Sequence, residues 1–138
     1  MIIVSACLMG VNCRYDGANC LNETLISILS KDVFIPVCPE QLGGLPTPRL
    51  PSHIAFGTGN DVLNNRSMLL DSSGKDVTEY FIRGANEVLH IARLMKVDTA
   101  FMKEFSPSCG VLHIKRDGLE VEGMGVTASL LSAMGINI

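Results

Sequence analysis

The stretch DVTEYFIRGANEVLHIARLMKVDTAFMK (residues 76–103) decides the fold class. Its first four residues fit a capping box, with Asp76 as the N-cap and Glu79 three positions later. Apolar residues then recur at steps of three and four from Val77 to Met95, which predicts an amphipathic helix. The helix leads into TAFMK (residues 99–103), which we predict to be a strand. A helix that runs directly into a short apolar strand is typical of an α/β protein.

Further strands are predicted on both sides of this unit. Residues 2–5 (IIVS) and residues 33–37 (VFIPV) are short, β-branched, apolar runs, and a helix capped by Asn22 separates them. After residue 103, an Asp-Gly pair at 117–118 predicts a small hairpin, and residues 125–134 predict a last helix. The alternation predicts a three-layer, Rossmann-like α/β fold, with a mainly parallel sheet flanked by helices.

Length and composition limit the classes of protein. The 138 residues, 47% hydrophobic and 18% charged, predict one globular domain over residues 1–138. The segment from Pro39 to Lys75 holds three prolines within six residues and is predicted to be a long irregular loop. Basic residues number 11 against 14 acidic ones, which argues against a nucleic-acid partner. No apolar run reaches the roughly 20 residues of a membrane span, and no signal peptide is recognisable, so we expect a cytoplasmic protein.

Three of the five cysteines follow the three main predicted strands. Cys7 comes just after the first strand, Cys38 just after the second and Cys109 just after the third. The carboxyl ends of parallel strands meet at one edge of the sheet, where ligands bind. If these strands are neighbours, the three thiols converge. A single cysteine after a strand can simply be a buried structural residue. A cysteine after each of the three main strands favours a shared chemical role instead.

Converging thiols could serve several chemistries. A structural zinc site is disfavoured because the chain has no C-x-x-C pair. The C-x₅-R loop of a phosphatase is absent at all three positions. A Cys–His hydrolase has candidate partners in His53, His90 and His113, none of which lies in a local signature. An iron–sulfur cluster suits soft thiolates, and three ligands on a four-iron cluster would leave one iron open to act as a Lewis acid.

Six segments resemble a small bacterial family that includes thiouracil desulfidase. They are SACLMG (5–10), NCRYDG (12–17), VCPEQLGGLPTPRLP (37–51), DVT (76–78), KEFSPSCG (103–110) and GVTASLL (125–131). They run in order through essentially the whole chain. The resemblance implies a 4Fe–4S cluster bound by Cys7, Cys38 and Cys109. It also implies non-redox removal of sulfur, as sulfide, from a small thiolated compound similar to thiouracil.

The resemblance also implies roles for two further residues. Glu40 matches the acidic residue of the CPE motif and would act as a general base or proton shuttle. Ser106 matches a serine that would position or protonate the substrate. Cys13 and Cys20 are not assigned to the cluster, and Arg49 and Lys103 are the basic residues expected to face the site. The oligomeric state is left open.

Two other functions remain compatible with the same cysteines. One is a non-catalytic module that binds metal or sulfide through the three thiols. The other is a metal-free enzyme with Cys109 as the nucleophile. Iron content, the phenotype of a Glu40 variant and the effect of replacing Cys20 distinguish these functions from the desulfidase.

Overall fold

A three-stranded parallel sheet organises the structure, a computed structural model that describes residues 1–138. The strands are β1 (Ile2–Ser5), β2 (Phe34–Val37) and β5 (Thr99–Phe101), in the order β2-β1-β5. β1 pairs in parallel with both neighbours, so that Ile3 faces Ile35 on one side and Ala100 on the other. Ile3 and Val4 are fully buried, because the central strand of a parallel sheet is covered on both faces.

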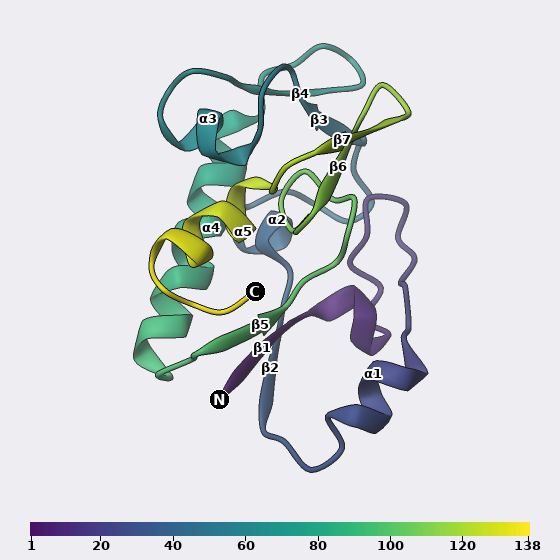
Figure 1. Ribbon diagram of the computed structural model, residues 1–138. Coiled ribbons are helices and arrows are strands. Elements are labelled where there is room, and N and C mark those ends of the chain that lie inside the picture. Colours follow the sequence, from purple (N-terminus) through teal and green to yellow (C-terminus); the bar gives the residue numbers. More distant parts are fainter.

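Helices lie on both sides of this sheet (Figure 1). On one side, α4 (Thr78–Leu94) and α5 (Val126–Ala133) pack on the strands and on each other. The apolar face of α4 follows from its sequence period, and its buried residues are Phe81, Gly84, Ala85, Val88, Leu89 and Ala92. On the other side, α1 (Glu23–Ile28) follows the 3₁₀ turn η1 (Ala6–Met9), which continues β1.

The short helix α2 (Pro39–Leu42) is seated on α4 by two glycines. A Cβ atom at Gly84 would collide with the carbonyl oxygen of Pro39, and one at Gly43 would collide with that of Tyr80. The two backbones therefore approach more closely than any side chain would allow. This contact fixes the position of α2, which begins immediately after β2.

A second apolar cluster lies beneath two small antiparallel sheets. The β3 (Ser52–Ile54) and β4 (Leu69–Asp71) pair and the β6 (His113–Arg116) and β7 (Leu119–Glu122) hairpin lie at the same end of the molecule, with α3 (Gly59–Leu63) nearby (Figure 1). The buried cluster there consists of Ile54, Val62, Leu69, Val77, Phe81, Ala85, Ile114 and Val126. It is separate from the cluster between the parallel sheet, α4 and α5.

The α/β class, the parallel sheet and its flanking helices agree with the sequence-based expectation. The three-layer, Rossmann-like arrangement stays a prediction. The hairpin forms where expected, because Asp117 and Gly118 have the positive φ angles (50° and 78°) of a tight turn. Asn22 caps α1 through its side-chain oxygen, which accepts from the backbone N–H of Leu25.

Two expectations were wrong. The segment 39–75 is not an irregular loop, since it contains α2, β3, α3 and β4. Each of these elements has only three to five residues, too few for a hydrophobic period to be recognised. The capping box at Asp76 is absent, because α4 begins at Thr78 and Asp76 instead accepts from the N–H and hydroxyl of Thr78.

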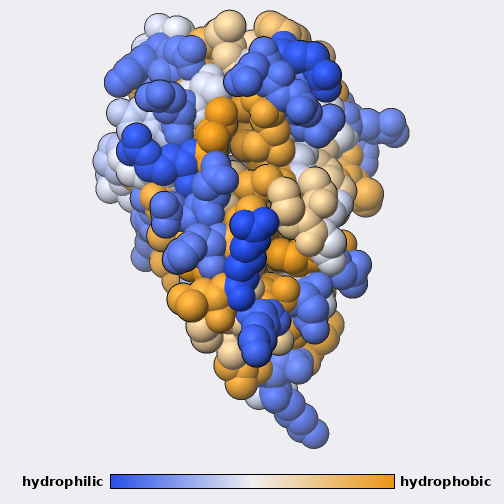
Figure 2. Space-filling view, turned by 90° about the vertical axis from the view of Figure 1, so that its left-hand side faces the viewer, coloured by the Kyte–Doolittle hydropathy of each residue, from blue (hydrophilic) through white to orange (hydrophobic).

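The outer surface on the side of α4 and α5 is mixed in polarity. On the side of α4 and α5, hydrophilic side chains cover much of the surface and apolar ones show between them (Figure 2). No helix combines the length and apolar character that crossing a bilayer requires.

Candidate cysteine-lined site

A cavity of about 290 Å³ lies at the carboxyl edge of the parallel sheet. Cys7, Cys38 and Cys109 all line it. Cys7 lies in η1 directly after β1, Cys38 is the residue between β2 and α2, and Cys109 lies in the turn beyond β5. Because β2 and β5 flank β1, the three strand ends are neighbours. The structure therefore brings the three predicted cysteines together.

Cys13 is a fourth cysteine in the cavity, and its side chain is only 2% exposed. Its side chain packs with those of Cys7 and Cys38, and the Cys38 thiol donates a hydrogen bond to the backbone carbonyl oxygen of Cys13 at 3.7 Å. The neighbouring Cys13 thiol lowers the pKa of Cys38 to about 6 and holds the pKa of Cys7 below its ordinary value. The two neighbouring sulfur atoms in turn raise the pKa of Cys13. Cys38 is thus favoured as a thiolate, the form that binds metals, and Cys7 forms its thiolate more readily than an ordinary cysteine, whereas Cys13 forms it less readily.

Cys109 has a different environment. Burial raises the pKa of this thiol to about 12, although the nearby Ser5 hydroxyl acts in the opposite direction. A cysteine nucleophile that works without metal needs a lowered pKa and partial exposure, and Cys109 has neither. This weighs against the metal-free enzyme. A bound metal, in contrast, deprotonates a coordinating thiol outright.

The donor set suits an iron–sulfur cluster better than a single ion. No group of three or more histidine, cysteine or acidic side chains is close enough to hold one metal ion. The thiolates of a four-iron cluster bind different irons, so they must surround a cavity instead of meeting at one point. Three soft thiols at three strand ends around one cavity satisfy that requirement.

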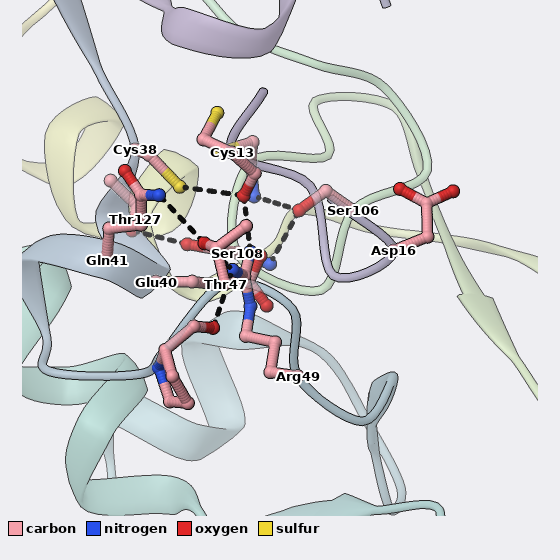
Figure 3. A network of polar contacts seen from close by, with 12 residues as sticks. Cys13, Asp16, Cys38, Glu40, Gln41, Thr47, Arg49, Ser106, Ser108 and Thr127 are labelled. Atoms are coloured by element: carbon pink, nitrogen blue, oxygen red, sulfur yellow. Dashed lines mark hydrogen bonds and ion pairs between the residues drawn. The ribbon is translucent and has the colours of Figure 1, made fainter. Parts of the chain in front are cut away.

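Glu40 lies in the first turn of α2 and lines the cavity. Its Oε2 atom accepts a hydrogen bond from Nη2 of Arg49 at 3.0 Å. The Arg49 side chain is only 4% exposed, against 20% for Glu40. Figure 3 shows the two residues among the polar groups beside Cys13 and Cys38. The pair is therefore a partly buried ion pair at the wall of the cavity.

Ser106 also lines the cavity, and its oxygen organises the turn that carries Cys109. The Oγ atom accepts from the backbone N–H groups of Ser108 (3.2 Å) and Cys109 (3.1 Å). This is the ordinary use of a serine before proline in a turn. The hydroxyl proton is not committed to a protein acceptor, so it remains available to a ligand.

Glu104 was missed by the sequence analysis. Its carboxylate lines the cavity and accepts from four backbone N–H groups, at 2.8–3.3 Å, which belong to Phe105, Val111, Leu112 and His113. Burial raises the pKa of Glu104, but the four donors outweigh it and the pKa is lowered overall. This carboxylate closes the loop that presents Ser106 and Cys109.

Replacing Glu104 by alanine should lower the free energy of unfolding of the metal-free protein by about 2 kcal/mol, because four backbone N–H donors, three of them partly buried, lose a charged acceptor. The folded pKa lies below the unfolded one, so this stability is present above about pH 4.3. It is lost as the pH falls through the folded pKa. Glu104→Gln should remove that acid-side dependence. Urea unfolding at several pH values measures both effects.

Glu87→Ala, at an exposed position of α4, is the control and should change the free energy of unfolding by less than about 0.5 kcal/mol. If Glu104→Ala is as stable as this control, the carboxylate does not hold the loop.

Other predicted candidates fall outside the cavity. His53, His90 and His113 do not line it, which leaves the Cys–His hydrolase without a partner. Cys20 does not line it either, and its sulfur accepts from Nη1 of Arg14 at 2.9 Å.

The GVT motif is structural, because the first N–H groups of α5 bond to carbonyl oxygens of the turn that carries Cys109. The hydroxyls of Ser108 and Thr127 add a buried hydrogen bond of 2.8 Å between the same two segments. The motif therefore fixes that turn against α5.

The cavity carries an excess of positive charge. Its charged residues, apart from the cysteines, are Arg14, Arg49, Lys103 and Lys115 on the basic side and Glu40 and Glu104 on the acidic side. This excess stands out in a chain whose net charge is −3. It favours an anionic occupant, such as a cluster bound by three thiolates.

Fold and site define a small α/β protein with a cysteine-lined, cation-rich cavity at one edge of a parallel sheet. The sequence profile of the 2-thiouracil desulfurase family matches residues 2–138. The chain therefore belongs to this family, and the resemblance carried by the motifs is confirmed.

Two individual proteins illustrate this relationship. The uncharacterized protein YbbK of Bacillus subtilis (strain 168) is 40% identical over 141 residues, which cover 100% of this chain and 93% of YbbK. A solved structure of TudS, described as a [4Fe-4S]-dependent thiouracil desulfidase, is 37% identical and superposes with a TM-score of 0.84. The match covers 99% of this chain and 87% of that one.

Proposed function

We propose that this protein is an iron–sulfur enzyme that removes sulfur from a small thiolated compound, such as a thiolated pyrimidine, and releases it as sulfide. The observation that carries the proposal is the cavity lined by Cys7, Cys38 and Cys109, in a chain that belongs to the 2-thiouracil desulfurase family. The name of TudS, a [4Fe-4S]-dependent desulfidase of 37% identity, supports it further.

Cys7, Cys38 and Cys109 would hold a 4Fe–4S cluster through their thiolates. A cluster with only three protein ligands supplies an iron that can act as a Lewis acid toward a sulfur-containing ligand. The lowered pKa values of Cys7 and Cys38 favour the ligand form of two of the three thiols. The neighbouring basic side chains would balance the negative charge of the occupied site.

The proposed reaction is a hydrolysis without change of oxidation state. A thiocarbonyl and water give a carbonyl and hydrogen sulfide, so the C=S bond is replaced by a C=O bond and no external electrons are needed. Glu40 would accept a proton from the attacking water, since its carboxylate lies at the cavity wall. Ser106 would donate its free hydroxyl proton in a hydrogen bond to the substrate.

One observation favours a second candidate, a non-catalytic metal- or sulfide-binding module. Cys13 is buried beside Cys7 and Cys38, so the cavity contains four thiols. Four cysteine ligands are typical of clusters that transfer electrons and bind no substrate.

Anaerobic reconstitution tests the desulfidase. The protein should retain about four irons and as much acid-labile sulfide per chain. Incubated with 2-thiouracil, it should form uracil and sulfide in equal amounts without a reductant. Protein that holds iron but releases no sulfide from a panel of thiolated pyrimidines would support the binding module. Protein that stays free of iron would exclude the desulfidase and an iron-binding module alike.

A further inference from the structure

A single buried side chain connects Glu40 to two loops around the cavity. We infer that Arg49 is a positioning residue, which holds the carboxylate of Glu40 in the orientation needed for proton transfer. This inference rests on the proposed function and adds a residue to it. The Arg49 side chain is only 4% exposed and lines the cavity.

The guanidinium group has four hydrogen-bond acceptors. Its Nη2 atom donates to Glu40 Oε2 at 3.0 Å and to the carbonyl oxygen of Cys13 at 2.9 Å. Its Nη1 atom donates to the carbonyl oxygen of Pro46 at 3.2 Å and to Oγ1 of Thr47 at 3.0 Å. One rigid group thus joins α2, the loop with Cys13 and the loop with Thr47 (Figure 3).

One backbone and one side-chain hydrogen bond strengthen the same junction. The N–H of Arg49 donates to the carbonyl oxygen of Tyr15 at 2.8 Å, and Gln41 Nε2 donates to Oγ1 of Thr47 at 2.8 Å. Both ends of the arginine are therefore fixed. The carboxylate of Glu40, which extends from a helix only four residues long, obtains its only side-chain partner from this fixed group.

Stability alone does not explain an arginine here. Its Nε atom is buried without any hydrogen-bond partner. An unpaired buried donor is destabilising, and a buried ion pair is often no more stable than apolar side chains of similar volume. A role in orienting Glu40 explains why a buried arginine is kept here. The orientation of a reacting group contributes to the rate of reaction and not to the stability of the fold.

The geometry requires arginine specifically. The two terminal nitrogen atoms donate hydrogen bonds in two directions. Nη2 donates to Glu40 and Cys13, and Nη1 donates to the loop with Thr47. Lysine carries its three donors on one nitrogen and lacks the planar fork. We therefore expect Arg49→Lys to keep the charge and lose the orientation.

A double-mutant cycle with Glu40 tests the inference. The variants are Arg49→Met, Arg49→Lys, Glu40→Gln and the two double variants, each reconstituted and assayed with 2-thiouracil. Either Arg49 variant should lower kcat about 100-fold with little change in KM. Iron content should equal that of the parent protein. In the Glu40→Gln background, the same arginine substitution should have almost no further effect, because the two residues act as one unit.

Arg66→Met is the matched control. Arg66 also pairs with a carboxylate, Asp61, at 3.3 Å, but its side chain is 62% exposed and lies outside the cavity. Its kcat should be unchanged. If Arg49→Met does not fold, Arg49→Lys completes the cycle alone.

The outcomes separate the two ideas. Suppose that Glu40→Gln is slow and that an Arg49 substitution lowers its kcat by the same factor as in the parent protein. The positioning role of Arg49 is then overturned and the desulfidase stands. The same conclusion follows if the Arg49 substitutions raise KM and leave kcat unchanged. Full activity of Arg49→Lys would overturn the positioning role as well. Parent protein that holds iron and releases no sulfide would overturn the proposed function itself, and the role of Arg49 with it.

Discussion

Cys38→Ser is expected to abolish cluster binding, so that reconstituted protein holds no more iron than background and shows no visible absorption. A serine hydroxyl is a hard ligand that keeps its proton near neutral pH, whereas iron–sulfur clusters need thiolates. The pKa of Cys38 is lowered to about 6, which makes this thiol the readiest ligand in the cavity. Iron and acid-labile sulfide, measured after anaerobic gel filtration, give the result.

Cys20→Ser is the control, because it removes a thiol that does not line the cavity. The Cys20 sulfur is hydrogen-bonded to Arg14, and its replacement should leave the iron content unchanged. Circular dichroism before reconstitution verifies that both variants fold. Normal iron content in Cys38→Ser, or its loss in Cys20→Ser, would mean that the ligand set is wrong.

Glu40→Gln is expected to keep the cluster and lower turnover of 2-thiouracil by roughly 10²- to 10⁴-fold, the usual contribution of a positioned acid–base group. Glutamine has the same shape, and its amide oxygen can still accept from Arg49. It cannot take a proton from water. The loss should therefore fall on kcat, while iron content and the unfolding midpoint stay close to those of the parent protein.

Glu79→Gln, at an exposed position in the first turn of α4, removes a carboxylate remote from the cavity and should retain full activity. A Glu40→Gln protein that turns over 2-thiouracil at the parent rate would contradict the acid–base role. In that case another group at the cavity must accept the proton.

The meeting of the three cysteines was predictable because it depends on a simple rule. Cys7, Cys38 and Cys109 each follow a strand that apolar runs identify, and neighbouring parallel strands place their ends side by side. Their role as ligands stays a prediction. The position of Glu40 beside them follows equally simply, since it is two residues from Cys38 along the chain.

Other parts of the site depend on contacts that sequence patterns do not contain. Cys13 reaches the cavity only because its loop folds back against η1, and no period marks that path. Glu104 is an acceptor for N–H groups up to nine residues away, which a local pattern cannot reveal. Gly43 and Gly84 are points of close backbone contact, which no pattern in the sequence marks.

The central position of β1 affects when the site can exist during synthesis. This strand, which includes Ile2 and Ile3, pairs with Thr99 and Ala100, so its second neighbour is made long after the strand itself. A nascent polypeptide that has not yet reached residue 109 lacks one wall of the cavity. Assembly of an inorganic cofactor here therefore has to follow synthesis of Cys109, and a product truncated before that residue would lack one of the three thiols.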